Sequence, residues 1–276
     1  MTVAELGDLV DLAAYPIDDL DGERARALVA RCRAELAGSN SCFLPRFVTL
    51  SALRRMQDQA RRVATLAWFG GGRVNAYYDE GDPSFPARHP RNVFFDRPVG
   101  IVAYDQMAPD SALCRLYLQD ELIEFLRRVV DVDELHRVND RYQPISVMVL
   151  KGGQTMGWHF DVSEFTVTML LQAPEAGGDF EFVHNIRSAD DPSYDAIGAL
   201  YEGDRSRVRV VAPEPGALFV FQGRHSLHHV TEVVGARDRL MAVLTFDTVA
   251  GATIDEATNV ATYGPRVAMG AVAGRP

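Results

Sequence analysis

Seven short apolar runs between residues 145 and 247 constrain the fold of this chain more than any other feature of its sequence. Each run is rich in β-branched and aromatic residues, and turn residues such as the Gly-Gly pair at 177–178 separate the runs. The runs cover residues 145–151, 165–172, 178–184, 207–212, 217–223, 226–234 and 239–247. Short, closely spaced strands are typical of antiparallel sandwiches and barrels, so the pattern predicts a mainly β fold of one of these types, such as a jelly roll.

The sequence before residue 145 predicts flanking helices and one long loop. Apolar side chains recur at helical spacing over residues 21–40, 49–69 and 118–132. Gly38 is expected to end the first of these helices, and Thr49 or Ser51 can cap the second. Residues 70–110 contain many Gly, Pro and Asp and no periodicity, which indicates a long loop that can serve as a lid. The segment after residue 250 gives no clear prediction.

Composition excludes several classes of protein. The 276 residues are 47% hydrophobic and 24% charged, which is ordinary for a soluble globular chain. The three cysteines lack paired spacing, which argues against a disulfide framework and a thiolate zinc site. No apolar run reaches the length of a membrane span and the N-terminus lacks a signal pattern, so we expect a cytoplasmic protein without a membrane partner. A net charge of −10 without a basic patch argues against nucleic-acid binding.

A possible metal site combines residues from separate predicted strands. His159 and Asp161 precede the apolar run at 165–172. Such a pair arises easily by chance, and the two side chains can simply hydrogen-bond to each other without any further role. His228 lies inside a later run, and Arg239 follows it by 239 − 228 = 11 residues. Two histidines and one carboxylate form the facial triad of non-haem Fe(II) oxygenases, which leaves metal positions open for a co-substrate and dioxygen. A guanidinium inside a barrel can pair with the distal carboxylate of 2-oxoglutarate.

Residues 145–247 resemble the Fe(II)/2-oxoglutarate-dependent dioxygenases. The family motif is His-x-Asp, a long spacing, His and then Arg or Lys, and the segments GWHFD, GGDFEF and PGALFVFQG stand where its double-stranded β-helix has turns and core strands. More narrowly, GWHFDVSEFTVTMLLQ and GRHSLHHVTEVVGARDRL are similar to the free-amino-acid halogenases and their hydroxylase relatives. The resemblance implies that His159, Asp161 and His228 bind Fe(II) and that Arg239 binds 2-oxoglutarate, with Arg237 as the competing choice.

The resemblance also sets expectations for the reaction. In the halogenases of this group Gly or Ala replaces the carboxylate ligand and leaves room for chloride, whereas this chain has Asp161. Hydroxylation of an unactivated carbon is therefore expected, with desaturation, cyclisation or halogenation as alternative outcomes. The implied substrate is a small polar metabolite such as a free amino acid. Lysine-type halogenases have a histidine three residues before the first ligand, and Met156 at that position argues against lysine.

The resemblance predicts one oxygenase domain over residues 1–276, acting as a monomer or homodimer. Its parts would be helical support and lid over 1–144, the β-helix core over 145–247 and a tail over 248–276. Several site assignments stay open at this point. His225 and His229 are rivals of His228, and candidate substrate contacts are Glu164, Thr245, Asp247, Arg88, Arg91 and Arg97. A non-catalytic, cupin-type metal-binding module is the main rival function, but such a module has no need of an inward arginine at position 239.

Overall fold

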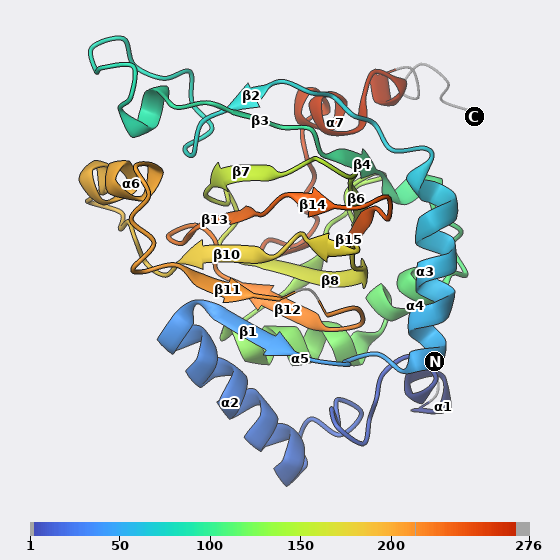
Figure 1. The fold of residues 1–276 in the computed structure, drawn as a ribbon. Coiled ribbons are helices and arrows are strands. Elements are labelled where there is room, and N and C mark those ends of the chain that lie inside the picture. Colours follow the sequence, from blue (N-terminus) through green and yellow to red (C-terminus); the bar gives the residue numbers. More distant parts are fainter. Residues whose placement is uncertain (1–2, 213, 269–276) are drawn as a thin grey trace.

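The computed structural model describes residues 3–212 and 214–268, and residues 269–276 of the predicted tail lie outside this part (Figure 1). Helices flank a β core, as the sequence predicts. The helices are α1 Val3–Gly7, α2 Glu23–Ser39, α3 Leu50–Ala64, α4 Ala112–Tyr117, α5 Asp120–Val130, α6 Tyr194–Tyr201 and α7 Glu256–Tyr263, with 3-10 turns η1 Pro90–Asn92 and η2 Tyr104–Gln106. None of the described helices is both long and apolar enough to cross a membrane.

The strands form two main antiparallel sheets. The larger sheet has the order β1 Ser41–Leu44, β12 Leu218–Phe221, β8 Thr166–Gln172, β15 Arg239–Leu244, β6 Ile145–Leu150 and β4 Gly100–Val102. The smaller sheet has the order β11 Arg209–Val211, β10 Phe180–Val183, β13 Leu227–Val230 and β7 Met156–His159. Three two-stranded pairs join β14 Val233–Val234 to β9 Ala176–Gly177, β16 Phe246–Asp247 to β5 His136–Arg137, and β2 Arg73–Val74 to β3 Phe95–Asp96. This arrangement confirms the predicted jelly roll.

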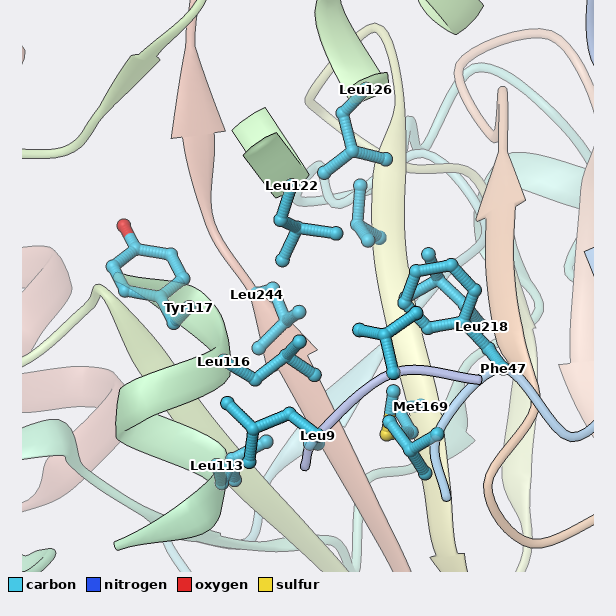
Figure 2. Packing of buried hydrophobic residues seen from close by; sticks show 14 of the residues in the cluster. Leu9, Phe47, Leu113, Leu116, Tyr117, Leu122, Leu126, Met169, Leu218 and Leu244 are labelled. Carbon is cyan, nitrogen blue, oxygen red and sulfur yellow. The ribbon is translucent and has the colours of Figure 1, made fainter. Parts of the chain in front are cut away.

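The larger sheet separates the apolar core from an inner cavity. On β15, Leu240 and Leu244 belong to the core that packs against the helices, whereas Arg239 and Val243 line the cavity. Successive side chains of a strand point to opposite faces, so this alternation follows from the sequence. Figure 2 shows the core side chains of α4 and α5 meeting those of the sheet, including Leu122 against the strand that carries Leu244.

The predicted loop at 70–110 contains more structure than expected. It includes β2, β3 and β4, and β4 extends the larger sheet by pairing with β6. The part of this loop around η1 reaches α6 on one side of the molecule (Figure 1). There the His89 ring lies 4.4 Å from the Tyr194 ring and stacks on Phe85 at 3.9 Å between ring centroids. These aromatic contacts fix the outer end of this loop against α6.

The helix ends differ from the prediction at one position and agree with it at another. The first predicted helix does not stop at Gly38: α2 continues to Ser39, and Asn40 adopts the left-handed conformation with φ 54°. Asparagine tolerates this conformation, so it can take the role expected of glycine. Of the two cap candidates for α3, Thr49 is the cap, and its side chain accepts a hydrogen bond from the Ala52 amide. The segment after residue 250, which gave no prediction, contains α7.

Candidate metal centre and inner cavity

The three predicted metal ligands lie together at one end of the smaller sheet, two on its strands and one just after a strand. His159 ends β7 and pairs across the sheet with His228 on β13, while Asp161 follows two residues after His159. Their ligand atoms all lie within 4.8 Å of one another, and His228 Nε2 is 3.4 Å from Asp161 Oδ1. Within the described residues, no other group of three His, Cys, Asp or Glu side chains comes this close together.

Backbone carbonyls orient both imidazoles. His159 Nδ1 lies 2.8 Å from Gly157 O, and His228 Nδ1 lies 2.9 Å from Ser226 O. A carbonyl oxygen can only accept, so each Nδ1 carries a proton, and in the neutral form of the ring each Nε2 then offers a lone pair. Contacts of this kind fix the tautomer of metal-binding histidines. Ser226 is itself held, because its Oγ accepts a 2.9 Å hydrogen bond from the amide of Asn40.

Asp161 is positioned by two neighbours. Thr166 Oγ1 donates a 2.8 Å hydrogen bond to Asp161 Oδ2, and the Asp161 amide donates to Gly223 O over 3.1 Å. A Cβ atom at Gly223 would collide with the Asp161 carboxylate. Glycine at position 223 therefore provides the space in which this carboxylate points toward the histidines.

The charges of the cluster suit a divalent cation. Burial and, to a smaller extent, the neighbouring His228 together lower the pKa of His159 to about 3, so this imidazole is neutral near pH 7. Burial opposes ionisation of Asp161, but His228 and the hydrogen bond from Thr166 nevertheless hold the pKa of this carboxyl below its usual value. Two imidazole nitrogens and one carboxylate form a donor set that fits Fe(II) and other divalent metals.

A single cavity between the two sheets contains the three ligands and Arg239. Arg239 is only 5% exposed, and its Nε donates a 3.0 Å hydrogen bond to Gly178 O. Among the described residues nothing pairs with its two Nη groups, and burial lowers the pKa of the guanidinium to about 10. The competing residue Arg237 is exposed and spends its donors on the carbonyls of Ala173 and Pro174 at 2.9 Å each.

The rest of the cavity wall is mostly apolar. Methionine and phenylalanine side chains from both sheets, such as Met148, Met156 and Phe180, surround the ligands. The polar lining residues other than the triad and Arg239 are Thr166, Thr168 and Glu214. An apolar wall strengthens an ion pair inside the cavity because it excludes water.

The open assignments separate by position. Of the three candidate arginines in the 70–110 loop, Arg97 lines a small pocket together with His159, and its buried Nε has no hydrogen-bond partner. Arg91 instead pairs with Asp79 at 2.9 Å, and Arg88 is exposed. Among the histidine rivals, His229 points to the opposite face of β13, where Trp158 stacks on it at 3.9 Å between ring centroids.

The remaining candidates do not gather at the metal ligands. His225 lies in the turn before β13, and it is not among the residues that line the cavity. Glu164 pairs with Arg224 at 3.1 Å, and the Asp247 carboxylate accepts a hydrogen bond from the Val249 amide. The backbone carbonyl of Thr245 accepts from Tyr117 Oη.

Two residues beside the ligands escaped the sequence analysis. Tyr78 lies edge-on to His159 at 5.9 Å between ring centroids, and its φ of 58° is unusual for a residue other than glycine. Arg187 lies on the far side of Asp161 with its guanidinium against the Phe160 ring. Neither belongs to a motif with the spacing of a ligand set. A hint was available only in the Asn-Ala-Tyr-Tyr-Asp stretch of the lid at 75–79, which combines aromatic and turn residues.

Comparison with known proteins adds two findings. Residues 96–262, which are more than half of the chain, match the family model described as Halogenase D. No curated protein sequence matches the chain.

Several solved structures share the fold. The epimerase SnoN in complex with Fe3+, alpha ketoglutarate and nogalamycin RO is 14% identical with a TM-score of 0.52, over 83% of this chain and 93% of SnoN. AviO1 from Streptomyces viridochromogenes Tue57 is 17% identical with a TM-score of 0.54, over 82% and 97% of the two chains. The alpha ketoglutarate dependent carbocyclase SnoK from nogalamycin biosynthesis is 14% identical with a TM-score of 0.53, over 78% and 82%.

Proposed function

Since the chain belongs to the Halogenase D family, within the Fe(II)/2-oxoglutarate-dependent oxygenases, we propose that it hydroxylates an unactivated carbon of a small amino acid or amino-acid derivative. The observation that carries the proposal is the pairing, in one cavity, of a His-Asp-His cluster with a buried arginine that has unused donors. In a protein that only binds a metal, this buried cation would have no counterion. An oxygenase supplies its counterion as the distal carboxylate of 2-oxoglutarate.

In this proposal each polar residue has one task. His159, Asp161 and His228 would hold Fe(II) through two Nε2 atoms and a carboxylate oxygen, and Arg239 would hold 2-oxoglutarate through its Nη groups. Bound Fe(II), with 2-oxoglutarate and dioxygen, supplies the oxidising power that breaks a C–H bond. The apolar wall around Met156 excludes water, and Arg97 offers a partner for a substrate carboxylate beside His159.

Asp161 supports hydroxylation over halogenation. A carboxylate ligand fills the position that the halogenases of this group leave open for chloride, and Thr166 and Gly223 hold this carboxylate toward the histidines. SnoN and SnoK are an epimerase and a carbocyclase, so this fold also supports other outcomes. The product therefore has to be identified directly.

We also propose that residues 1–276 act as one oxygenase domain, as a monomer or homodimer in the cytoplasm. The N-terminal helices support this division, because α2, α3 and α5 share a single apolar core with the larger sheet. The three cysteines are free and buried, which agrees with a reducing compartment.

The proposal is tested by supplying the protein with Fe(II), 2-oxoglutarate, dioxygen and single amino acids in chloride buffer. Succinate release and the product mass are measured together. The expected result is amino-acid-dependent succinate release with a mass gain of one oxygen atom. A chlorinated product would overturn the hydroxylase proposal, and metal binding without any 2-oxoglutarate binding would favour the non-catalytic module.

A further inference from the structure

A second pocket opens beside Asp161, outside the oxygenase cavity. The lid residues Tyr77 and Tyr78 form one wall, and the arginines Arg187 and Arg224 form another. Tyr78 also lines the pocket that contains Arg97 and His159, so the two pockets share this tyrosine, one beside His159 and the other beside Asp161. This pocket, which we call the arginine pocket, has no role in the proposed reaction so far.

Arg187 is a fixed cation with unused donors. Its guanidinium carbon lies 3.7 Å from the centre of the Phe160 ring and 5.8 Å from that of Tyr77. Its Nε donates a 2.8 Å hydrogen bond to Arg224 O, which sets the plane of the guanidinium. Among the described residues no carboxylate lies within ion-pair distance of Arg187. The two Nη groups are therefore available to a ligand.

Arg224 adds a second positive charge with weak compensation. Its Nη2 donates a 2.6 Å hydrogen bond to Val162 O. Its ion-pair partner is Glu164, whose carboxylate side chain is 70% exposed and consequently screened by water. Burial lowers the pKa of Arg187, and the positive charge of Arg224 acts in the same direction. The Asp161 carboxylate also lines this pocket, but Thr166 and His228 hold it on the side of the metal ligands. Glu164, which is screened by water, is thus the only ion-pair partner of the two guanidinium groups among the described residues.

An arginine held against an aromatic ring can be purely structural, because the bond from Arg187 Nε to Arg224 O steadies the turn that precedes His228. That role uses one donor and does not require the Nη groups to face a pocket. Paired guanidinium groups with free donors are suited to planar or tetrahedral anions, which they bind by charge-assisted hydrogen bonds. A ligand anion would also offset the repulsion between the two cations.

We propose that Arg187 and Arg224 form an anion subsite for an acidic group of the substrate. This inference rests on the proposed function. Because Arg97 already offers a partner for one carboxylate beside His159, the substrate class narrows to small amino acids with a second anionic group. A side-chain carboxylate and a phosphate share the required chemistry.

The subsite is tested first without turnover. The full chain is loaded with Zn(II) and 2-oxoglutarate, so that acetate cannot occupy the site of Arg239. Acetate, inorganic phosphate and neutral acetamide are then titrated at constant ionic strength while the Nε–H signal of Arg187 is followed by NMR. We expect saturable shifts with acetate or phosphate and none with acetamide. The tighter of the two anions identifies the acidic group.

Matched variants separate binding from folding. In Arg187→Met the anion-dependent shifts of neighbouring amides should be lost, whereas Arg187→Lys should retain part of them. Arg33→Met is the control, because Arg33 Nε also donates to a backbone carbonyl, that of Arg128, but lies in the exposed part of α2. Absence of saturable shifts in the wild type, or equal loss in Arg33→Met, would overturn the subsite.

Turnover then distinguishes the subsite from the proposed function. L-glutamate is compared with L-glutamine, and O-phospho-L-serine with L-serine, by succinate release. We expect one acidic member to be preferred, and Arg187→Met to raise its KM by about tenfold to a hundredfold, as loss of a charge-assisted hydrogen bond does. If neutral and acidic members react equally in both proteins, the subsite inference is wrong although the oxygenase stands. If anions bind but no amino acid stimulates succinate release, the proposed function fails instead.

Discussion

The variant Arg239→Met tests two effects of the buried guanidinium separately: its effect on the stability of the cofactor-free protein and its effect on the affinity for 2-oxoglutarate. The substitution keeps an apolar side chain of similar length and removes the guanidinium, which is 5% exposed and has one hydrogen bond to Gly178. Burial lowers the pKa of Arg239 to about 10. Each pKa unit corresponds to 1.36 kcal/mol, so the charged form of Arg239 destabilises the cofactor-free protein by roughly 3 kcal/mol.

Two opposite effects follow from this magnitude. In the metal-free protein without 2-oxoglutarate, Arg239→Met should raise the free energy of unfolding, by at most about 3 kcal/mol and less where the methionine packs imperfectly. In the presence of Fe(II), the same substitution leaves the distal carboxylate of 2-oxoglutarate buried and unpaired. That loss costs about 2–5 kcal/mol, which corresponds to a thirtyfold to several-thousandfold weaker affinity.

The measurements are urea unfolding of the metal-free protein and an anaerobic titration of the Fe(II)-loaded protein with 2-oxoglutarate, followed by the visible charge-transfer band. Arg237→Met is the matched control, because Arg237 is exposed and donates to the carbonyls of Ala173 and Pro174. It should leave the affinity for 2-oxoglutarate within about twofold of the wild type, since exposed contacts contribute little. Equal affinities of Arg239→Met and wild type, or loss of affinity in Arg237→Met alone, would refute the reasoning.

Three further predictions concern the ligands and the helical support. Gly223→Ala should weaken Fe(II) binding at least about tenfold in a metal titration, because its Cβ would displace the Asp161 carboxylate. Gly38→Ala, where a Cβ meets no other atom, should instead stabilise α2 by about 0.5–1 kcal/mol in urea unfolding. Unchanged metal affinity in Gly223→Ala would count against Asp161 as a ligand. Addition of Zn(II) should raise the unfolding midpoint of the wild type and a chelator should reverse the shift, while Asp161→Ala should lose most of it; a shift of equal size in the variant would place the metal elsewhere. The hydrogen bond from Arg127 lowers the pKa of Glu124 to about 2, so its contribution to stability is complete above the ordinary value near 4.5 and is lost as the pH falls toward 2; Glu124→Gln should flatten the pH dependence of unfolding in that window, and an unaltered slope would contradict this origin.

The strands that the sequence predicted are those in which apolar residues either alternate with polar ones or follow one another without interruption. All seven predicted runs contain strands of the two main sheets, because their β-branched and aromatic residues pack on a pleated surface. In contrast, β7, Met156–His159, has only four residues and no alternation of apolar and polar side chains. Its pairing with β13 makes it a strand, and the sequence of the segment alone does not predict that pairing. The strand β4 was not predicted for the same reason, because its extended conformation depends on its pairing with β6.

The candidate site was predictable where one strand or one motif determines it. His159 and Asp161 are two residues apart, and the inward direction of Arg239 follows from the alternation of β15. Tyr78 and Arg187 depend instead on how the lid and the turn after β10 fold back over β7. Such contacts join segments about a hundred residues apart, and no periodicity within either segment records them. The choice between Arg88, Arg91 and Arg97 needed the same information.

The polar groups of this barrel share one energetic property. Arg239 has unused donors in an apolar cavity, Arg97 has a buried Nε without a partner, and Arg187 faces a second cation. Each of these arrangements costs stability in the ligand-free protein, since buried charges require compensation. Ligands that bring carboxylates to these positions return the cost as affinity, so the cofactor-free protein should gain more stability from 2-oxoglutarate and an acidic substrate together than from either alone. In thermal unfolding, a stabilisation by both ligands together that is no larger than the stabilisation by one of them would contradict this reasoning.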